Sequence, residues 1–129
     1  MNWITLKKNI ETNRFDYLFR NHFNLTRYYI HKFLLKKNNI NVSDYISNKY
    51  LKNKKYNLVK NTFPYHLEKN ILHLVLWIND LNIKNIKSII KKELEIKYKK
   101  EYEFLFFENP KHLRSINDIK HFHIFVKLY

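Results

Sequence analysis

The chain has 129 residues, of which 45% are hydrophobic and 17% aromatic. This balance predicts one folded domain over residues 1–129 and excludes a disordered chain. The absence of cysteine excludes a disulfide framework, a thiolate metal site and a cysteine nucleophile. No apolar run approaches the roughly 20 residues of a membrane span, and the first residues do not resemble a secretory signal. We therefore expect an intracellular, cytoplasmic protein, with a nuclear location as the alternative.

The formal net charge of +14 favours polyanionic partners such as nucleic acid, phosphorylated metabolites or an anionic membrane surface. The composition also suggests another cause. Glycine is absent, lysine far outnumbers arginine, and the over-used residues have A/T-rich codons. Codon usage in an A/T-rich viral or parasite genome is the favoured explanation, because phosphate-binding sites usually prefer arginine. Four arginines are present, Arg14, Arg20, Arg27 and Arg114.

Apolar residues at helical spacing predict helices in the first sixty residues. One stripe lies within residues 15–19, and a break is expected around residues 24–26. Asn41 or Ser43 is a candidate N-cap for a short third helix. The second stripe consists of Tyr29, Ile30, Phe33 and Leu34.

The second half predicts strand, helix, strand and strand. Residues 52–60 form a basic connection, and the apolar run Ile71–Ile78 predicts a buried strand. A helix is expected over residues 81–100, followed by strands at residues 103–107 and 121–128. The fold class is therefore α+β, with a helical N-terminal half, a small C-terminal sheet and one long helix covering it.

Histidines on the predicted strands are the first candidate site residues. His121 and His123 are two residues apart, so they lie on one face of their strand, and Phe122 and Ile124 lie on the other. The pair is expected to include a general base, a nucleophile or a phosphate ligand; a purely structural role is the alternative. His73 approaches this pair if the two strands are neighbours.

The segment between the last two predicted strands supplies further candidates. Glu108 and Asn109 end a strand, where ligand-binding loops often begin, although Asn109 also suits a turn. Arg114 and Ser115 offer a guanidinium and a hydroxyl for an anionic oxygen, with a surface arginine and an ordinary cap as the alternative. A metal site is disfavoured, because His121 and His123 supply only two ligands, and a third must come from His66, His73, Glu108 or Asp118. We predict no metal and no cofactor.

Several short motifs, in their shared order, resemble a largely fungal family of unknown function that includes the N-acetylglucosamine-induced protein. The segments that carry the resemblance are residues 61–65 (Asn-Thr-Phe-Pro-Tyr), 71–77, 106–109, 113–116 and 121–124 (His-Phe-His-Ile). The similarity covers nearly the whole chain. It departs from the family pattern at Thr62, where an aspartate is usual, at Arg114, where a lysine is usual, and at residues 69–70. The family implies no established activity.

A fainter similarity is to the histidine-triad nucleotide hydrolases and transferases. The shared features are Asn109, Ser115 and the alternating His121 and His123, whereas Phe125 replaces the third alternating histidine. By this similarity His123 is the nucleophile, and Ser115 or Arg114 is a phosphate ligand. Fold-level analogy of this kind does not establish function.

The residues predict a protein that binds a small phosphorylated ligand, such as a nucleotide or sugar phosphate, in a histidine-lined pocket. Whether the protein also hydrolyses or transfers this ligand does not follow from the sequence. One alternative is nucleic-acid binding through the lysines of residues 52–60 and 81–100. The other is a structural or partner-binding module without catalysis. A glycine-rich phosphate loop is excluded, because the chain has no glycine. Neither the ligand nor the oligomeric state follows from the sequence.

Overall fold

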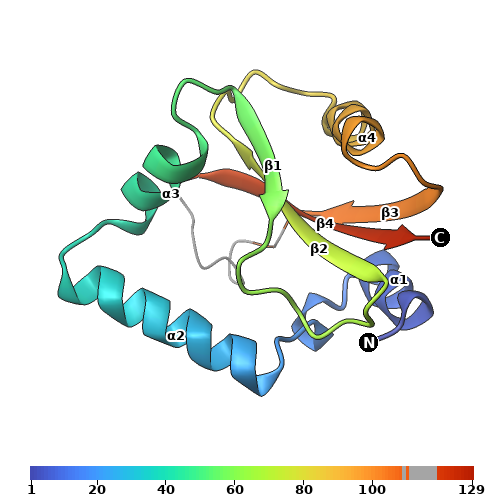
Figure 1. Cartoon of the computed structure of the whole chain (residues 1–129), viewed down its shortest axis with the longest axis horizontal. Helices are drawn as coiled ribbons and strands as arrows, with labels where there is room; N and C mark the ends of the chain where they lie inside the picture. Colours follow the sequence, from blue (N-terminus) through green and yellow to red (C-terminus); the bar gives the residue numbers. More distant parts are fainter. Residues whose placement is uncertain (109, 111–118) are drawn as a thin grey trace.

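The computed structural model describes residues 1–108, 110 and 119–129. Helices dominate the N-terminal half, and a four-stranded sheet forms most of the remainder (Figure 1). The α+β class predicted from the sequence is confirmed. The elements in chain order are α1 (Trp3–Glu11), the short helix η1 (Phe15–Tyr17), α2 (His22–Lys37), α3 (Val42–Tyr50), β1 (Tyr56–Lys60), β2 (Ile71–Ile78), α4 (Ile86–Lys97), β3 (Tyr102–Phe107) and β4 (Lys120–Leu128).

The strands form one antiparallel sheet in the order β1-β2-β4-β3. Strand β4 lies between β2 and β3, and its register places His123 opposite Val75 and His121 opposite Trp77. The strand that carries the histidine pair is therefore central and adjoins the strand that carries His73. Because the two strands are neighbours, His73 can approach the pair, as the sequence analysis required.

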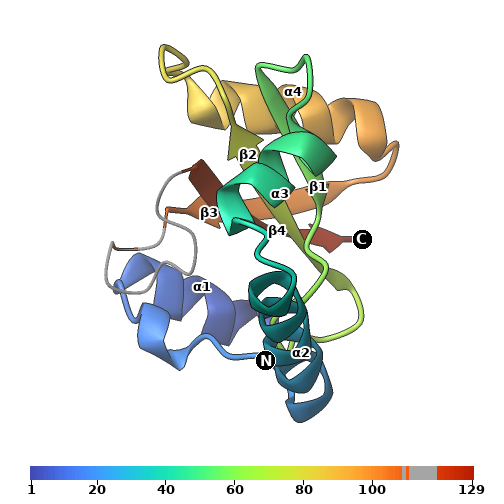
Figure 2. The same ribbon diagram turned by 90° about the vertical axis from the view of Figure 1, so that its left-hand side faces the viewer.

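One face of the sheet packs against α4 (Figure 2). Ile90 and Leu94 of α4 are fully buried against the even-numbered residues of β2 and β4. Burial of such a side chain stabilises a fold by about 1.5–3 kcal/mol. This core consists of Leu58, Leu74, Leu76, Ile78, Ile90, Leu94, Ile124 and Val126.

The opposite face of the sheet packs against the N-terminal helices. Trp3 and Leu6 of α1 lie in one cluster with Phe125, and Ile46 of α3 lies in another with Trp77. The odd-numbered residues of β2 and β4, including the three histidines, point to this side. The predicted alternation of the two strand faces is confirmed.

The predicted helix over residues 81–100 is too long. Helix α4 begins only at Ile86. Before it, the Asp80 side chain accepts a hydrogen bond from the Asn82 amide at 2.9 Å and stabilises a turn. The helix ends at Lys97, before the extended residue Tyr98. The expected stripe nevertheless faces the sheet, and the lysines of the other face are exposed.

The connection predicted at residues 52–60 contains a strand that the sequence did not reveal. Residues Tyr56–Lys60 form β1, an edge strand paired with β2. Leu58 is its one buried residue, and lysines at positions 54, 55 and 60 flank it. The many lysine and asparagine residues hide the alternation of apolar and polar side chains that would have predicted this strand. Charged side chains are common on strands at the edge of a sheet.

The second helical stripe lies in helix α2 but does not face the core. Tyr29, Ile30, Phe33 and Leu34 are exposed, and Leu35 is the one buried residue of α2. The inward side of α2 instead carries Tyr28 and His31, which border a cavity. The helix also begins earlier than the predicted break at residues 24–26, because the Asn21 side chain caps it by accepting from the Asn24 amide. Within residues 1–108, 110 and 119–129, no helix is long and apolar enough to cross a membrane.

Asparagine takes the place of glycine where helices end. Asn13, Asn39 and Asn53 have positive φ values of 57°, 55° and 59°, and each lies just beyond a helix. Asparagine is the residue after glycine that best tolerates this left-handed conformation. A chain without glycine therefore still stops its helices sharply.

Of the two candidate caps for the third helix, Asn41 is the N-cap. Its side-chain oxygen accepts hydrogen bonds from the amides of Ser43 and Asp44 at 2.9 and 3.2 Å. We expect Asn41→Ala to lower the free energy of unfolding by about 1 kcal/mol, because two amides lose their acceptor. Urea denaturation checks this value. An unchanged midpoint would contradict the assignment.

Candidate functional site

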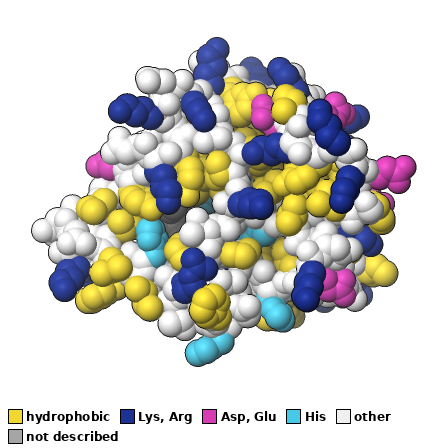
Figure 3. All heavy atoms as spheres, viewed as in Figure 1, with side chains coloured by type: hydrophobic (Ala, Val, Ile, Leu, Met, Phe, Trp, Pro, Cys, Tyr) yellow, Lys and Arg dark blue, Asp and Glu magenta, His cyan; other side chains and the backbone are white. Residues whose placement is uncertain are grey.

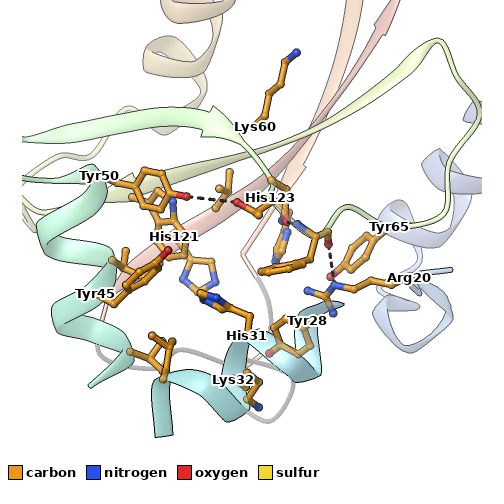
Figure 4. Close-up of a pocket in the computed structure, with 18 residues that line it drawn as sticks. Arg20, Tyr28, His31, Lys32, Tyr45, Tyr50, Lys60, Tyr65, His121 and His123 are labelled. Carbon is orange, nitrogen blue, oxygen red and sulfur yellow. Dashed lines mark hydrogen bonds between the residues drawn. The ribbon is translucent and has the colours of Figure 1, made fainter. Parts of the chain in front are cut away.

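A pocket of about 250 Å³ lies between the α2–α3 pair and the sheet face that carries the histidines (Figure 4). Its walls come from α2, α3, the β1–β2 connection, β2 and β4. Segments far apart in the sequence therefore meet here. The side chains with polar groups that line it include Arg20, Tyr28, His31, Lys32, Tyr45, Tyr50, Lys60, Asn61, Thr62, Tyr65, Trp77, His121 and His123.

A buried pair of histidines lies at the base of the pocket, where His123 lines the cavity and His73 lies behind it. The Tyr65 amide donates to His73 Nδ1 at 3.1 Å, and His73 Nε2 lies 2.9 Å from His123 Nδ1. Since an amide can only donate, neutral His73 carries its proton on Nε2 and donates it to His123. Neutral His123 then carries its own proton on Nε2. His123 is thus held as a hydrogen-bond donor.

His121 is held in the opposite tautomer. Its Nδ1 lies 3.0 Å from the carbonyl oxygen of Ile119, which can only accept. Neutral His121 therefore carries its proton on Nδ1 and has a lone pair on Nε2. The two histidines of one strand face thus differ in chemistry: the Nε2 atom of His121 is a base, and that of His123 is a donor.

Burial keeps the histidine pair uncharged. His73 and His123 are each 5% exposed. Desolvation lowers the pKa of His73 well below its usual value, and the charges of His123 and Arg20 lower it further. Desolvation, helped by His121 and Arg20, lowers the pKa of His123 to about 3. At neutral pH this pair is therefore a neutral hydrogen-bonded unit and not a cation.

An aromatic stack holds the pair in place. The Tyr65 ring lies 4.5 Å from the His73 ring and 5.5 Å from the His123 ring. The fully buried Phe125 ring lies 4.6 Å from His73, and the Phe107 ring lies 5.2 Å from His123. Imidazoles packed between rings cannot rotate freely, so their nitrogen atoms have defined directions.

The β1–β2 connection shapes the end of the pocket next to His73. The Asn61 amide donates to the His73 carbonyl at 2.9 Å and extends the strand pairing by one residue. The Asn61 side chain then accepts from the Phe63 amide at 2.8 Å and turns the chain. This turn places Phe63 and Tyr65 on the pocket wall.

Arg20 supplies the ionised group that points into the pocket (Figure 4). Its Nε donates to the Phe63 carbonyl at 2.8 Å, and its guanidinium lies 4.2 Å from the Tyr28 ring centre and 5.5 Å from that of Tyr65. One edge of the guanidinium is therefore anchored, and the planar group lies against aromatic rings. Such a pre-organised arginine suits an anionic group.

Charges around the pocket have one sign. The described lining residues include Arg20, Lys32 and Lys60, and none of them is aspartate or glutamate. The ammonium groups of Lys32 and Lys60 point away from the cavity and make its rim basic (Figure 4). Inside, burial and the charge of Lys49 lower the pKa of His31. The pocket combines one inward cation with imidazoles and hydroxyls.

One polar atom beside the pocket lacks a partner. The indole N–H of the lining residue Trp77, which is 7% exposed, is the one buried side-chain nitrogen or oxygen without a hydrogen bond in the described part of the chain. Its ring lies 6.0 Å from the Tyr50 ring and 4.9 Å from the His121 ring. An unsatisfied buried donor is costly, so this position favours an acceptor that the described residues do not supply.

The residues described do not form a metal site. No group of three or more histidine, aspartate or glutamate side chains within residues 1–108, 110 and 119–129 could hold a metal ion. His66 contacts Phe19 at a ring distance of 6.0 Å and is not a lining residue. Asp118, one of the candidates for a third ligand, lies outside the described residues.

The structure brings together some of the predicted site residues. His121 and His123 line the pocket, and His73 lies directly behind His123. Glu108 is partly buried at the end of β3 and is not a lining residue. Asn109, Arg114 and Ser115 lie outside the described residues, so their predicted roles stay predictions.

The opposite wall was not predicted. Arg20, His31, Tyr45 and Tyr50 come from the helical half, at sequence distances that no local pattern connects to His121. One sequence signal pointed there, because Arg20 is among four arginines in a chain rich in lysine. The motif at residues 61–65, which carries part of the family resemblance, also contributes Asn61, Thr62, Phe63 and Tyr65 to the pocket.

Comparison with known proteins places the chain in a family without assigning an activity. No curated protein matches it. The crystal structure of HTC1 resembles it with a TM-score of 0.72 over 99% of this chain and 85% of that chain, at 19% sequence identity, so the fold is shared. A family model described as "Protein of unknown function (DUF3605)" matches residues 2–127. Since the match spans nearly the whole sequence, this chain belongs to that family of proteins of unknown function.

Proposed function

We propose that this protein binds a small phosphorylated ligand, a nucleotide or sugar phosphate, in the pocket between α2, α3 and the sheet. The observation that carries the proposal is the guanidinium of Arg20, which points into a cavity whose described lining residues include no carboxylate. A planar cation with an anchored Nε presents its remaining N–H groups in a geometry that matches phosphate oxygens.

The size and walls of the pocket support a mononucleotide or a sugar phosphate. Its volume of about 250 Å³ lies near the lower end of the range of small-molecule sites. Tyr50 and Trp77 offer aromatic surface at one end, and the indole N–H of Trp77 calls for an acceptor. A nucleobase supplies both a flat ring and acceptor atoms, so a nucleotide is the first ligand to test.

Hydrolysis or transfer of that ligand is an extension of the proposal. In their neutral forms, His121 offers a lone pair on Nε2, whereas His123 offers an N–H. In a hydrolysis of a phosphate ester, His121 would take a proton from the attacking water as the water oxygen bonds to phosphorus, and His123 would donate a hydrogen bond to a phosphate oxygen. The ester P–O bond would break, and the leaving oxygen would take a proton from solvent. This division differs from the one implied by the histidine-triad similarity, in which His123 is the nucleophile.

Titration calorimetry at near-physiological salt tests binding. We expect adenosine monophosphate to bind and adenosine not to bind, and the pair glucose phosphate and glucose tests the sugar-phosphate alternative. Arg20→Gln should weaken binding of the phosphorylated compound by about tenfold or more, because a hydrogen bond to a charged group contributes about 1.5–3 kcal/mol.

Arg14→Gln is the matched control. Arg14 is exposed, contacts the Tyr17 ring at 6.0 Å and does not line the pocket. The Arg14→Gln variant should bind the phosphorylated compound as the parent protein does. Arg20→Lys, which keeps the charge and loses the planar fork, should lie between the parent and Arg20→Gln. Equal binding by Arg20→Gln and Arg14→Gln, in variants with unchanged melting temperatures, would reject the proposal.

Nucleic-acid binding is a second candidate, favoured by the exposed lysines of α4. Lys87, Lys91 and Lys92 are exposed on the side of the sheet away from the pocket, and Lys54 and Lys55 are exposed before β1. Affinity for a single-stranded oligonucleotide that falls steeply with salt and ignores Arg20→Gln would favour this function. No binding in either assay would favour a structural or partner-binding module.

A further inference from the structure

Helix α2 has a second apolar face that points away from the molecule. The exposed fractions of Phe23, Phe33 and Ile30 are 69%, 63% and 53%. Tyr29 and Leu34 are also exposed. We call these five residues the outer α2 face. Large apolar side chains scattered singly on a surface are normal, but a contiguous set marks an interaction site.

The five residues lie on one side of the helix. Positions 23, 30 and 34 are separated by seven and four residues, which places them one above another at 3.6 residues per turn, and positions 29 and 33 flank them. Helix α2 runs along the outer edge of the molecule (Figure 1), and apolar side chains gather over it in the space-filling view (Figure 3). The face is therefore convex and protrudes.

The lysine and arginine side chains of α2 give this helix a purely positive charge. The sequence of α2 contains Arg27, Lys32, Lys36 and Lys37 and no aspartate or glutamate. These four side chains are exposed, and the guanidinium of Arg27 lies 5.6 Å from the Phe23 ring. Lys32 lies on the pocket side of α2, whereas Arg27, Lys36 and Lys37 border and interrupt the apolar surface. A second copy of this chain, with its formal net charge of +14, would place like charges together.

We propose that the outer α2 face docks on an anionic membrane surface. An interfacial helix buries aromatic and aliphatic side chains at the boundary between headgroups and acyl chains, while flanking lysine and arginine contact anionic headgroups. The outer α2 face has both features on a protruding ridge. A ridge suits a deformable planar interface, which needs no matching groove. The proposal is independent of ligand binding, because the pocket uses the inward side of α2.

Flotation with vesicles tests this proposal on the full chain. We expect binding to phosphatidylcholine–phosphatidylserine vesicles and little binding to vesicles of phosphatidylcholine alone. A triple variant with Phe23→Ser, Ile30→Ser and Phe33→Ser should lose about tenfold or more of the affinity, because three apolar side chains no longer enter the interface. Since these positions are exposed, the variant should keep its melting temperature.

Two charge variants separate docking from general attraction. Arg27→Gln, Lys36→Gln and Lys37→Gln together remove three charges beside the outer α2 face. Lys87→Gln, Lys91→Gln and Lys92→Gln together remove three charges from α4, on the other side of the sheet. The first set should weaken vesicle binding strongly, and the second should weaken it little.

Four outcomes would overturn the proposal. Equal losses in the two charge variants would mean nonspecific attraction, and unchanged binding by the serine variant would mean that the apolar face takes no part. Light scattering that shows a dimer, dissociated by the serine substitutions, would mean that a second copy covers the face. Failure to bind vesicles in a protein that stays monomeric would assign the face to a soluble acidic partner.

Discussion

Between pH 6.5 and about 3, the buried histidine pair should make the protein steadily less stable. In the unfolded chain both imidazoles take up a proton near their usual pKa of 6.5, whereas in the folded protein His123 does so only at about pH 3 and His73 well below its usual value. The unfolded state therefore binds more protons below pH 6.5, and acid favours unfolding. Their full contribution is present above pH 6.5 and is lost as the pH falls.

The free energy of unfolding should fall steeply with falling pH. One such histidine lowers the free energy of unfolding by about 1.4 kcal/mol for each pH unit of this range. Two such histidines would remove much of a typical free energy of unfolding, about 5–15 kcal/mol, within a few pH units. Urea denaturation between neutral and mildly acidic pH measures the slope. A stability that is flat over this range would show that the pair is not buried in its neutral form.

His123→Gln separates the pair from other acid-sensitive groups. The amide oxygen of glutamine can still accept from His73 Nε2, so the hydrogen bond is preserved while one titrating group is removed. We expect the slope to fall by about 1.4 kcal/mol per pH unit. Phe125→Leu is the control, because it lowers stability and leaves both histidines in place. A slope that changes equally in the two variants would contradict the assignment.

Phe125→Ala should be the most destabilising single substitution considered for this protein. Phe125 is fully buried on a central strand, and its ring lies 4.6 Å from His73, 6.0 Å from Tyr65 and 5.9 Å from Phe107. Truncation leaves a cavity and removes the ring that supports the histidine pair. We expect the free energy of unfolding to fall by about 3–5 kcal/mol, measured by urea denaturation at neutral pH.

Phe23→Ala provides the matched comparison. It makes the same chemical change on α2, where the side chain is 69% exposed. Phe23→Ala should change the free energy of unfolding by no more than about 0.5 kcal/mol. Similar losses in the two variants would contradict the burial of Phe125. Phe125→Leu should cost less than Phe125→Ala, because most of the buried volume remains.

Local pattern was a good guide to the strands of the second half. The continuous apolar run at residues 71–78 and the alternation in residues 121–128 correspond to β2 and β4 within one residue. Burial on a sheet imposes a period of two, and this period is visible without any tertiary information. The same reasoning placed His121 and His123 on one face, where the structure has them.

Local sequence pattern was a poor guide to faces that line a pocket or lie at a sheet edge. The stripe of α2 at residues 29–34 satisfies the rule for a core-facing helix, yet it is exposed, because the other side of α2 lines a pocket and carries Tyr28 and His31. Strand β1 was missed because its buried residue, Leu58, is surrounded by polar and basic neighbours. Neither arrangement follows from the spacing of residues along the chain.

The sequence by itself determined the fold class, the family, the chemistry available and the face on which the histidines lie, because these depend on composition and on local periodicity. The tertiary structure decided which residues share a site. The hydrogen bond between His73 and His123 spans 50 positions. Arg20 reaches the opposite wall of the pocket from the segment before α2, and His31 reaches it from α2. Packing between distant elements creates such neighbours, and the tautomers of His121 and His123 follow from them.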